Sequence, residues 1–145
     1  MRPKTYFYKT GVSWERERRG YLTSPGKPDM ELGAPPEFKG HEGIWTPESL
    51  FVAAVEGCIM TSFFAFSRGL NLVAYESKAE GRLDLDEQKM SFVFTTVSVT
   101  PRVVVASEED VAKAREALNM AEKRCLVTNS LKTEVVVQPE IVVSE

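Results

Sequence analysis

The residues with the clearest chemical potential in this sequence are its two cysteines. Cys58 lies within the apolar run TPESLFVAAVEGCIMTSFFAF (46–66), and Cys125 directly follows a basic pair, Lys123 and Arg124. A reactive cysteine must ionise, because the thiolate is the nucleophile and a free thiol, with a pKa of about 8.5, is only slightly ionised near neutral pH. Two thiols can act as a redox pair, in which one attacks a substrate and the other attacks the oxidised sulfur. Alternatively both are core residues, since free cysteine is among the most buried residue types.

The sequence offers few residues for other common site chemistries. Its single histidine, His41, lies in the glycine-rich turn KGHEG, so a Ser-His-Asp or Cys-His arrangement would have to use that residue. The chain contains neither HExxH nor CxxC, and neither cysteine has a further ligand at the spacing of a zinc site. We therefore expect no metal and no organic cofactor, and the two thiols remain the main candidates.

The local sequence around Cys58 does not activate its thiol. The residues three and four positions away on a helix are small or apolar: Ala54, Val55, Thr61 and Ser62. Apolar burial raises the pKa of a thiol, so a reactive Cys58 needs a cation from elsewhere in the fold. The candidate cations all precede the apolar run: Arg16, Arg18, Arg19 and Lys39.

Cys125 is expected near the C-terminus of a helix. The negative end of the helix dipole disfavours a thiolate there, although Lys123 and Arg124 are adjacent in sequence. This position makes Cys125 a poorer first nucleophile than Cys58. It suits a residue that attacks an already oxidised sulfur.

A long helix is predicted to begin at TPES and to run to about residue 68. Thr46 suits the N-cap, Pro47 suits the first helical position, and Gly69 provides a stop. The interior of this helix is apolar on nearly every face, so it must be buried nearly all round. In a chain of 145 residues we expect a second subunit to supply part of that burial.

The other predicted elements are mostly strands. Alternating or β-branched patterns predict strands over 4–14, 20–23, 29–33, 81–87 and 91–106, and a loop over 34–45. A capping-box pattern of Ser107 and Asp110 opens a second helix, and a last strand covers 133–143. One face of the second helix carries Val111, Ala114, Leu118, Ala121 and Cys125. The predicted order is β-β-β-α-β-β-α-β, a single α+β domain over residues 1–145 with two central helices on an antiparallel sheet.

Composition excludes several classes of protein. Apolar residues make up 43% of the chain and charged residues 27%, which is typical of a globular protein rather than a disordered one. A net charge of −3 argues against general nucleic-acid binding, which needs a basic face. The apolar run is short for a membrane span and contains Glu56, and no secretory signal is visible. We therefore expect a cytoplasmic protein with no membrane and no nucleic-acid partner.

Two segments of the chain resemble a known family. PPEFKGHEGIWTPESLFVAAVEGC (35–58) looks like the segment that holds the reactive cysteine of the OsmC/Ohr family, the osmotically inducible and organic-hydroperoxide-resistance proteins. AEKRCLVTNSLKTEVVV (121–137) looks like the segment around that family's second cysteine. The resemblance spans nearly the whole chain, and it implies an OsmC/Ohr-like fold assembled as an intertwined homodimer.

The resemblance also assigns roles to individual residues. It implies that Cys58 is the peroxidatic cysteine, Cys125 the resolving cysteine and Glu48 the active-site glutamate. Arg18, two residues before a glycine in RRGYL, matches the family arginine, although Arg16 and Arg19 are close enough to remain alternatives. The loop before the helix holds no arginine but only Lys39, which departs from the OsmC-like arrangement.

By resemblance, the chain is a thiol-dependent peroxidase in oxidative or osmotic stress defence. It would reduce organic hydroperoxides to alcohols through a Cys58 sulfenate and a Cys58–Cys125 disulfide, with a lipoyl-type or other external dithiol, or a small thiol, as reductant. The alternative is a non-enzymatic dimer of the same fold that binds a ligand or senses redox state. Glu56 matches no catalytic position of the family, and a buried carboxylate needs a partner, either across the dimer or at a pocket.

Overall fold

The structure is a computed structural model that describes residues 4–145. The chain forms two compact units, Met1–Phe51 and Val52–Glu145, and the boundary falls inside the long helix α1 (Pro47–Phe66). A single domain over 1–145 stays a prediction.

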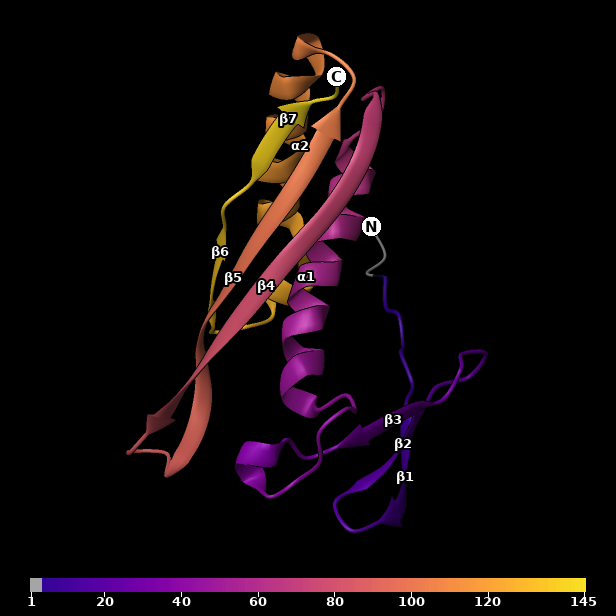
Figure 1. The fold of residues 1–145 in the computed structure, drawn as a ribbon, viewed down its shortest axis with the longest axis vertical. Helices are drawn as coiled ribbons and strands as arrows, with labels where there is room; N and C mark the ends of the chain where they lie inside the picture. Colours follow the sequence, from indigo (N-terminus) through magenta and orange to yellow (C-terminus); the bar gives the residue numbers. More distant parts are fainter. Residues whose placement is uncertain (1–3) are drawn as a thin grey trace. The chain divides into compact units, whose positions relative to one another are not determined.

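The first unit contains a three-stranded antiparallel sheet (Figure 1). Its strands, in sheet order, are β1 (Gly11–Arg16), β2 (Arg19–Thr23) and β3 (Met30–Gly33). The second and third strands match the prediction, whereas the strand expected over 4–14 is regular only from Gly11. The predicted loop over 34–45 contains one short turn of 3-10 helix, η1 (Pro36–Phe38).

Helix α1 begins as its sequence predicts. The backbone N–H of Ser49 donates to Oγ1 of Thr46 at 3.0 Å, and the backbone N–H of Thr46 donates to Oγ of Ser49 at 2.9 Å. This reciprocal pair satisfies two donors at the helix start, and Pro47 occupies the first helical position. The helix ends at Phe66, and Gly69 follows with a φ of +77°, the left-handed conformation that favours glycine.

Burial of α1 within one chain is limited to one face. Of its 20 residues, only Val55, Ile59 and Phe63 are buried, and these share one face. By length and composition α1 is also the one helix of residues 4–145 that could cross a membrane, a test that core helices of soluble proteins pass as well. One chain thus buries a single face of α1, and the second subunit expected to cover the rest stays a prediction.

The second unit contains a mixed four-stranded sheet. Strand β4 (Leu72–Asp86) pairs antiparallel with β5 (Ser91–Val105), while β6 (Glu134–Val137) and β7 (Glu140–Val143) both pair parallel with β5. The predicted all-antiparallel sheet is wrong, because the helical connection between β5 and β6 returns the chain in the same direction. The predicted last strand over 133–143 is interrupted at Gln138 and Pro139, where proline has no N–H to donate.

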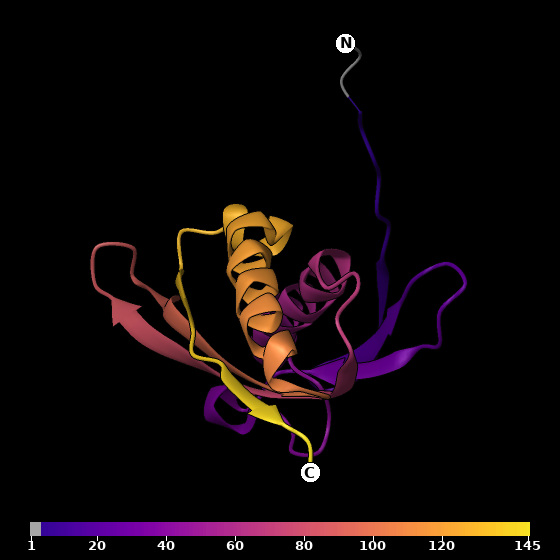
Figure 2. The same cartoon turned by 90° about the horizontal axis from the view of Figure 1, so that it is seen from above.

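Helices α1 and α2 (Glu108–Arg124) lie on the same side of this sheet (Figure 2). The α2 face predicted from spacing is buried at Ala114, Leu118 and Ala121, and it packs with Phe63 of α1 and Val103 of β5. The predicted capping box is incomplete, because Oγ of Ser107 donates to Oδ2 of Asp110 at 3.1 Å rather than bonding a backbone N–H. This core holds α1, which carries Cys58, against α2, which Cys125 directly follows.

Candidate functional site

The chain between α2 and β6 places Cys125 at a junction of two helices. Cys125 follows the last residue of α2 with extended backbone (φ −61°, ψ 111°), and its side chain caps the short helix α3 (Leu126–Asn129). Its thiol therefore lies at the negative end of α2 and, at the same time, next to the free backbone N–H groups that begin α3. From the sequence we expected only the negative end of α2 at Cys125, and not the backbone N–H groups of α3.

The thiols of Cys58 and Cys125 interact within the second unit. Burial raises the pKa of Cys58, but hydrogen bonding from the Cys125 thiol, from the backbone N–H groups of Val127 and Leu126, and from Ser62 outweighs it. The net effect lowers the pKa of Cys58 below its ordinary value. Its Sγ lies 3.9 Å from Oγ of Ser62, one turn further along α1.

The pKa of Cys125 shifts in the opposite direction. Burial raises it most, and the interaction with Cys58 raises it further. Thr128 opposes both effects, because its backbone N–H and its Oγ1 lie 3.4 Å and 3.2 Å from the Cys125 Sγ and donate to it. Cys125 is fully buried, whereas Cys58 is half-buried.

This arrangement gives the two sulfurs unequal roles. The pKa of Cys58 is lowered and its thiol is partly accessible, whereas the pKa of Cys125 is raised and its thiol is buried. An accessible low-pKa thiolate next to a second thiol is typical of a redox-active cysteine with a resolving partner. The sequence identified both cysteines, but it missed the donors from α3, because backbone N–H groups carry no residue signature.

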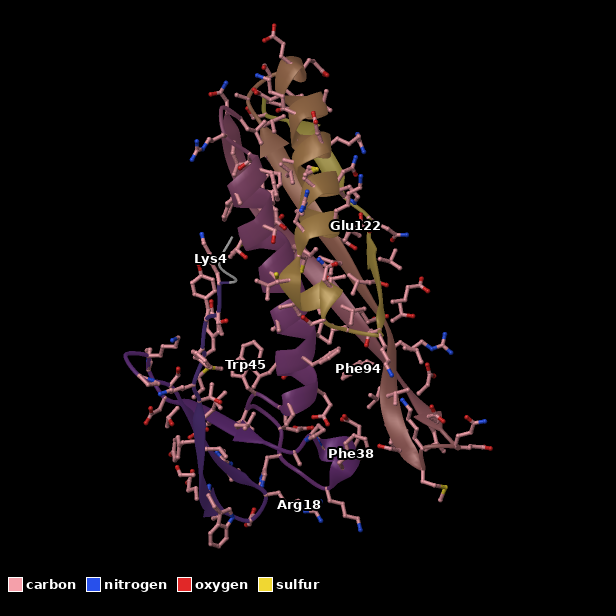
Figure 3. All side chains as sticks on the ribbon, turned by 180° about the vertical axis from the view of Figure 1, so that it is seen from behind. Lys4, Arg18, Phe38, Trp45, Phe94 and Glu122 are labelled. Carbon is pink, nitrogen blue, oxygen red and sulfur yellow. The ribbon has the colours of Figure 1, made fainter. Side chains whose placement is uncertain are left out.

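The other two predicted site residues, Arg18 and Glu48, belong to the first unit. Nη1 of Arg18 donates to the backbone oxygen of Phe38 at 3.1 Å, and both residues are labelled in Figure 3. Oε1 of Glu48 is buried and has no hydrogen-bond partner among residues 4–145. Their predicted roles at Cys58 stay predictions.

The neighbouring arginines are engaged with carboxylates. Nη2 of Arg19 lies 3.0 Å from Oε2 of Glu31, and Nε of Arg16 lies 3.7 Å from Oε1 of Glu15. Over the described part of the chain, no such ion pair is found for Arg18. Of the three arginines considered from the sequence, Arg18 is therefore the one whose charge is not already shared with a carboxylate.

Glu56 has a partner that the sequence did not identify. Its Oε2 accepts a hydrogen bond from Oγ of Ser77 on β4, within the second unit. Burial and the Glu56 carboxylate together raise the pKa of the nearby Tyr75 to about 12. The partner is thus neither a second subunit nor a pocket, the two possibilities expected from the sequence.

The expectation that the protein holds no metal stays a prediction. Within residues 4–145, no group of three or more His, Cys, Asp and Glu side chains is arranged to hold a metal ion. His41, the only histidine, lies 3.3 Å from Oε2 of Glu17 through its Nε2, inside the first unit.

The fold is similar to those of several solved structures. An OsmC-like protein of unknown function from Vibrio cholerae is 23% identical, with a TM-score of 0.84 over 93% of this chain and 99% of that one. An organic hydroperoxide resistance protein OsmC from Legionella pneumophila is 20% identical, with a TM-score of 0.71 over 99% and 100% of the two chains. The organic hydroperoxide resistance protein OhrB of Bacillus subtilis is 22% identical, with a TM-score of 0.64 over 94% and 98%.

At these identities the solved structures show the fold alone, and no curated protein matches the sequence. The family model described as OsmC-like protein, however, matches residues 40–140, most of the chain and both cysteines. The chain therefore belongs to the OsmC-like protein family.

Proposed function

We propose that this protein is a thiol-dependent peroxidase that reduces organic hydroperoxides to alcohols. The observation that carries the proposal is the effect of the Cys58 and Cys125 thiols on each other, which lowers the pKa of the first and raises that of the second. Two of the solved relatives are named organic hydroperoxide resistance proteins, which supports the same substrate class for this chain.

In the first step, the Cys58 thiolate attacks the distal oxygen of the hydroperoxide. The O–O bond breaks, the alkoxide leaves and takes up a proton to become the alcohol, and Cys58 becomes a sulfenic acid. The donors around Cys58, from Ser62 and from the start of α3, stabilise the thiolate before attack.

In the second step, Cys125 attacks the Cys58 sulfenic acid. A disulfide forms, the S–O bond breaks and the hydroxyl leaves as water. A lipoyl-type or other external dithiol, or a small thiol, then returns both cysteines to the reduced state. No metal and no organic cofactor takes part in this scheme.

Arg18 and Glu48 complete the proposed site. Arg18 would hold Cys58 as a thiolate by charge attraction, and Glu48 would orient the arginine. Two observations support this assignment: Arg18 has no carboxylate partner in the described part of the chain, and a buried oxygen of Glu48 accepts no hydrogen bond there. A buried carboxylate oxygen without a donor is costly, so a guanidinium is a suitable partner for it.

The proposed assembly is a cytoplasmic homodimer in which a second copy covers α1. The helix is apolar along its length, yet one chain buries only one of its faces. Phe64 and Phe66, both on α1, remain 46% and 39% exposed. Apolar surface of this kind is typical of a protein interface.

The decisive experiment is a thiol titration of the purified protein before and after one equivalent of cumene hydroperoxide. We expect both thiols to disappear within seconds, to return with a dithiol, and to support repeated turnover. Cys58→Ser should abolish peroxide consumption, and Cys125→Ser should leave a sulfenic acid on Cys58 that a dimedone-type probe traps.

Two other outcomes would replace the proposal. If both thiols remain titratable after denaturation of the peroxide-treated protein, the chain is a non-enzymatic member of the family, and ligand binding becomes the favoured function. If both thiols oxidise once but no dithiol or small thiol supports turnover, the protein is a redox sensor.

A further inference from the structure

The sulfur of Cys125 is held by a residue with no role in the scheme above. Thr128 donates to it twice, from its backbone N–H at 3.4 Å and from Oγ1 at 3.2 Å. The sulfur is completely buried, an environment that disfavours its ionisation and would by itself make it a slow nucleophile. Of the groups with the largest effects on the pKa of this thiol, those of Thr128 are the ones that favour its charged form.

One turn of α3 provides hydrogen-bond donors to both sulfurs. The backbone N–H groups of Leu126 and Val127 act on Cys58, and the next N–H and hydroxyl along the chain, those of Thr128, act on Cys125. While Cys58 is a thiolate, its charge and its hydrogen bond keep the proton on Cys125. Once Cys58 has become a sulfenic acid that charge is gone, and the donors of Thr128 remain.

We propose that Thr128 is the positioning residue of the resolving step, which readies Cys125 for attack once Cys58 has been oxidised. The inference rests on the proposed function for the identity of the oxidant, an organic hydroperoxide. In the step it assists, the Cys125 thiolate forms the S–S bond as the S–O bond of the sulfenic acid breaks. The Cys58 sulfur is reduced, the Cys125 sulfur is oxidised, and the departing hydroxide takes up a proton to leave as water.

The titratable group that raises the pKa of Cys125 most is Cys58 of α1. Lys123 and Arg124, its neighbours at the end of α2, are exposed. A change in the reactivity of Cys125 on substitution of Thr128 can therefore be assigned to the Thr128 hydroxyl.

The test uses an aromatic disulfide reagent that releases a coloured thiolate, so it needs no peroxide. The accessible Cys58 attacks the reagent first and releases one equivalent, forming a mixed disulfide. Cys125 then attacks the Cys58 sulfur of that mixed disulfide, which forms the Cys58–Cys125 bond and releases a second equivalent. The second phase is the readout, and Cys125→Ser should abolish it.

Thr128→Val removes the hydroxyl and keeps the shape of the side chain. We expect this variant to slow the second phase and to leave the first phase unchanged, because the hydrogen-bond donors to Cys58 are other groups than the Thr128 hydroxyl. A tenfold loss of thiolate slows attack by only about threefold, since the more basic sulfur is the stronger nucleophile. A slowing of roughly threefold or more near neutral pH is therefore expected, and Thr128→Ser should restore the wild-type rate.

The pH profile separates this role from a merely structural one. At alkaline pH, where Cys125 is ionised in both proteins, the difference should vanish or reverse. Thr133→Val is the matched control, since the Thr133 hydroxyl donates to the backbone oxygen of Phe94 at 3.0 Å, away from the thiols. A second phase with the same rate in Thr128→Val and wild type, or one slowed equally at every pH, would overturn the inference.

The outcome is independent of the proposed activity. If cumene hydroperoxide fails to oxidise Cys58, the peroxidase proposal fails, whereas the two-phase experiment still decides whether Thr128 assists attack by Cys125. If the protein is a peroxidase, the sulfenic acid on Cys58 should also persist longer in Thr128→Val during a single turnover.

Discussion

The carboxylate of Glu56 on α1 accepts a hydrogen bond from the hydroxyl of Ser77 on β4. Cys58 is only two residues further along the same helix, and residues two apart on a helix face nearly opposite directions. Glu56 therefore faces the sheet, whereas Cys58 faces the start of α3. This relationship identifies Glu56 as an anchor between α1 and β4 rather than a proton acceptor for Cys58.

Ser77→Ala should destabilise the protein without changing its thiol chemistry. The substitution leaves the half-buried Glu56 carboxylate without its donor, which should lower the free energy of unfolding by about 1–2 kcal/mol. Thr95→Val is the matched control, because it removes a hydroxyl donor to Asp84 at an exposed site, and its loss should be smaller. Urea denaturation measures both. A shift in the pH dependence of Cys58 alkylation in Ser77→Ala would instead place Glu56 in the site.

Tyr75 should make the protein sensitive to alkali. Burial and the Glu56 carboxylate raise its pKa from 10.0 to about 12, so the unfolded phenol ionises at lower pH than the folded one. The corresponding stability is fully present below pH 10.0 and is lost as the pH rises towards about 12. The loss should reach about 2 kcal/mol, measured as the pH dependence of urea denaturation.

Tyr75→Phe should remove that part of the alkaline loss. Oη of Tyr75 is buried and has no hydrogen-bond partner among residues 4–145, so its removal should not destabilise the protein near neutral pH. Tyr8→Phe provides the control, since Tyr8 is 91% exposed. Equal alkaline slopes in Tyr75→Phe and wild type would show that other groups cause the loss.

Gly81→Ala should disturb the packing of α1 on β4. A Cβ at Gly81 would lie 2.6 Å from Cγ2 of Val52 and 2.9 Å from Cε1 of Phe94, closer than carbon atoms pack. We expect a loss of about 1–3 kcal/mol in unfolding free energy, partly relieved in the double variant with Val52→Ala. Strict additivity of the two single changes would argue against this contact.

Gly57→Ala tests the proposed homodimer. Nothing lies within 4 Å of a Cβ built at Gly57, and alanine is the better helix former by about 1 kcal/mol. A single chain should therefore be stabilised by the change. If a second copy covers this part of α1, the added methyl should weaken the dimer, roughly tenfold for a typical overpacking cost. Sedimentation over a concentration series measures this. A dimer unchanged by Gly57→Ala would move the interface away from Gly57.

Arg18→Ala should raise the pKa of Cys58. On the proposed pairing of Arg18 with Cys58, loss of the positive charge disfavours the thiolate, so the alkylation rate should reach its half-maximum at higher pH than in wild type. Arg16→Ala and Arg19→Ala are the controls, because both residues are paired with carboxylates. If one of them shifts the profile and Arg18→Ala does not, that arginine is the partner of the thiolate.

Much of the helical structure could be predicted because local signals determine it. Thr46 and Pro47 define the start of α1, and the buried spacing of Ala114, Leu118 and Ala121 defines the inner face of α2. Both depend on neighbours within a turn or two, which a sequence displays directly. The OsmC-like fold itself followed from the resemblance rather than from these patterns.

The sheet was harder to predict, since its pairing is long-range. The first half of β4 was missed because its inward positions include Tyr75, Ser77 and Ala79, which do not form an apolar alternation. The parallel pairing of β6 and β7 with β5 depends on the path of the chain after α2, which no local pattern records.

The site was predictable in its cysteines but not in its electrostatics. Residue types identified Cys58 and Cys125, and a cation was expected to be needed to lower the pKa of Cys58. Within the second unit the donors found there are another thiol, Ser62 and two backbone N–H groups, and the cation stays a prediction. Peptide groups are the same at every position, so only the fold of α3 reveals which of them bind a sulfur.

The hydrogen bonds from α3, including those of Thr128, also affect the reduction potential of the Cys58–Cys125 pair. They favour anionic or thiol sulfur, and a disulfide sulfur is a weaker acceptor that uses them less well. Stabilising the reduced form of a dithiol raises its reduction potential and makes the disulfide the stronger oxidant. A Cys58–Cys125 disulfide would therefore be readily reduced by a dithiol, as a cycle of repeated oxidation and reduction requires.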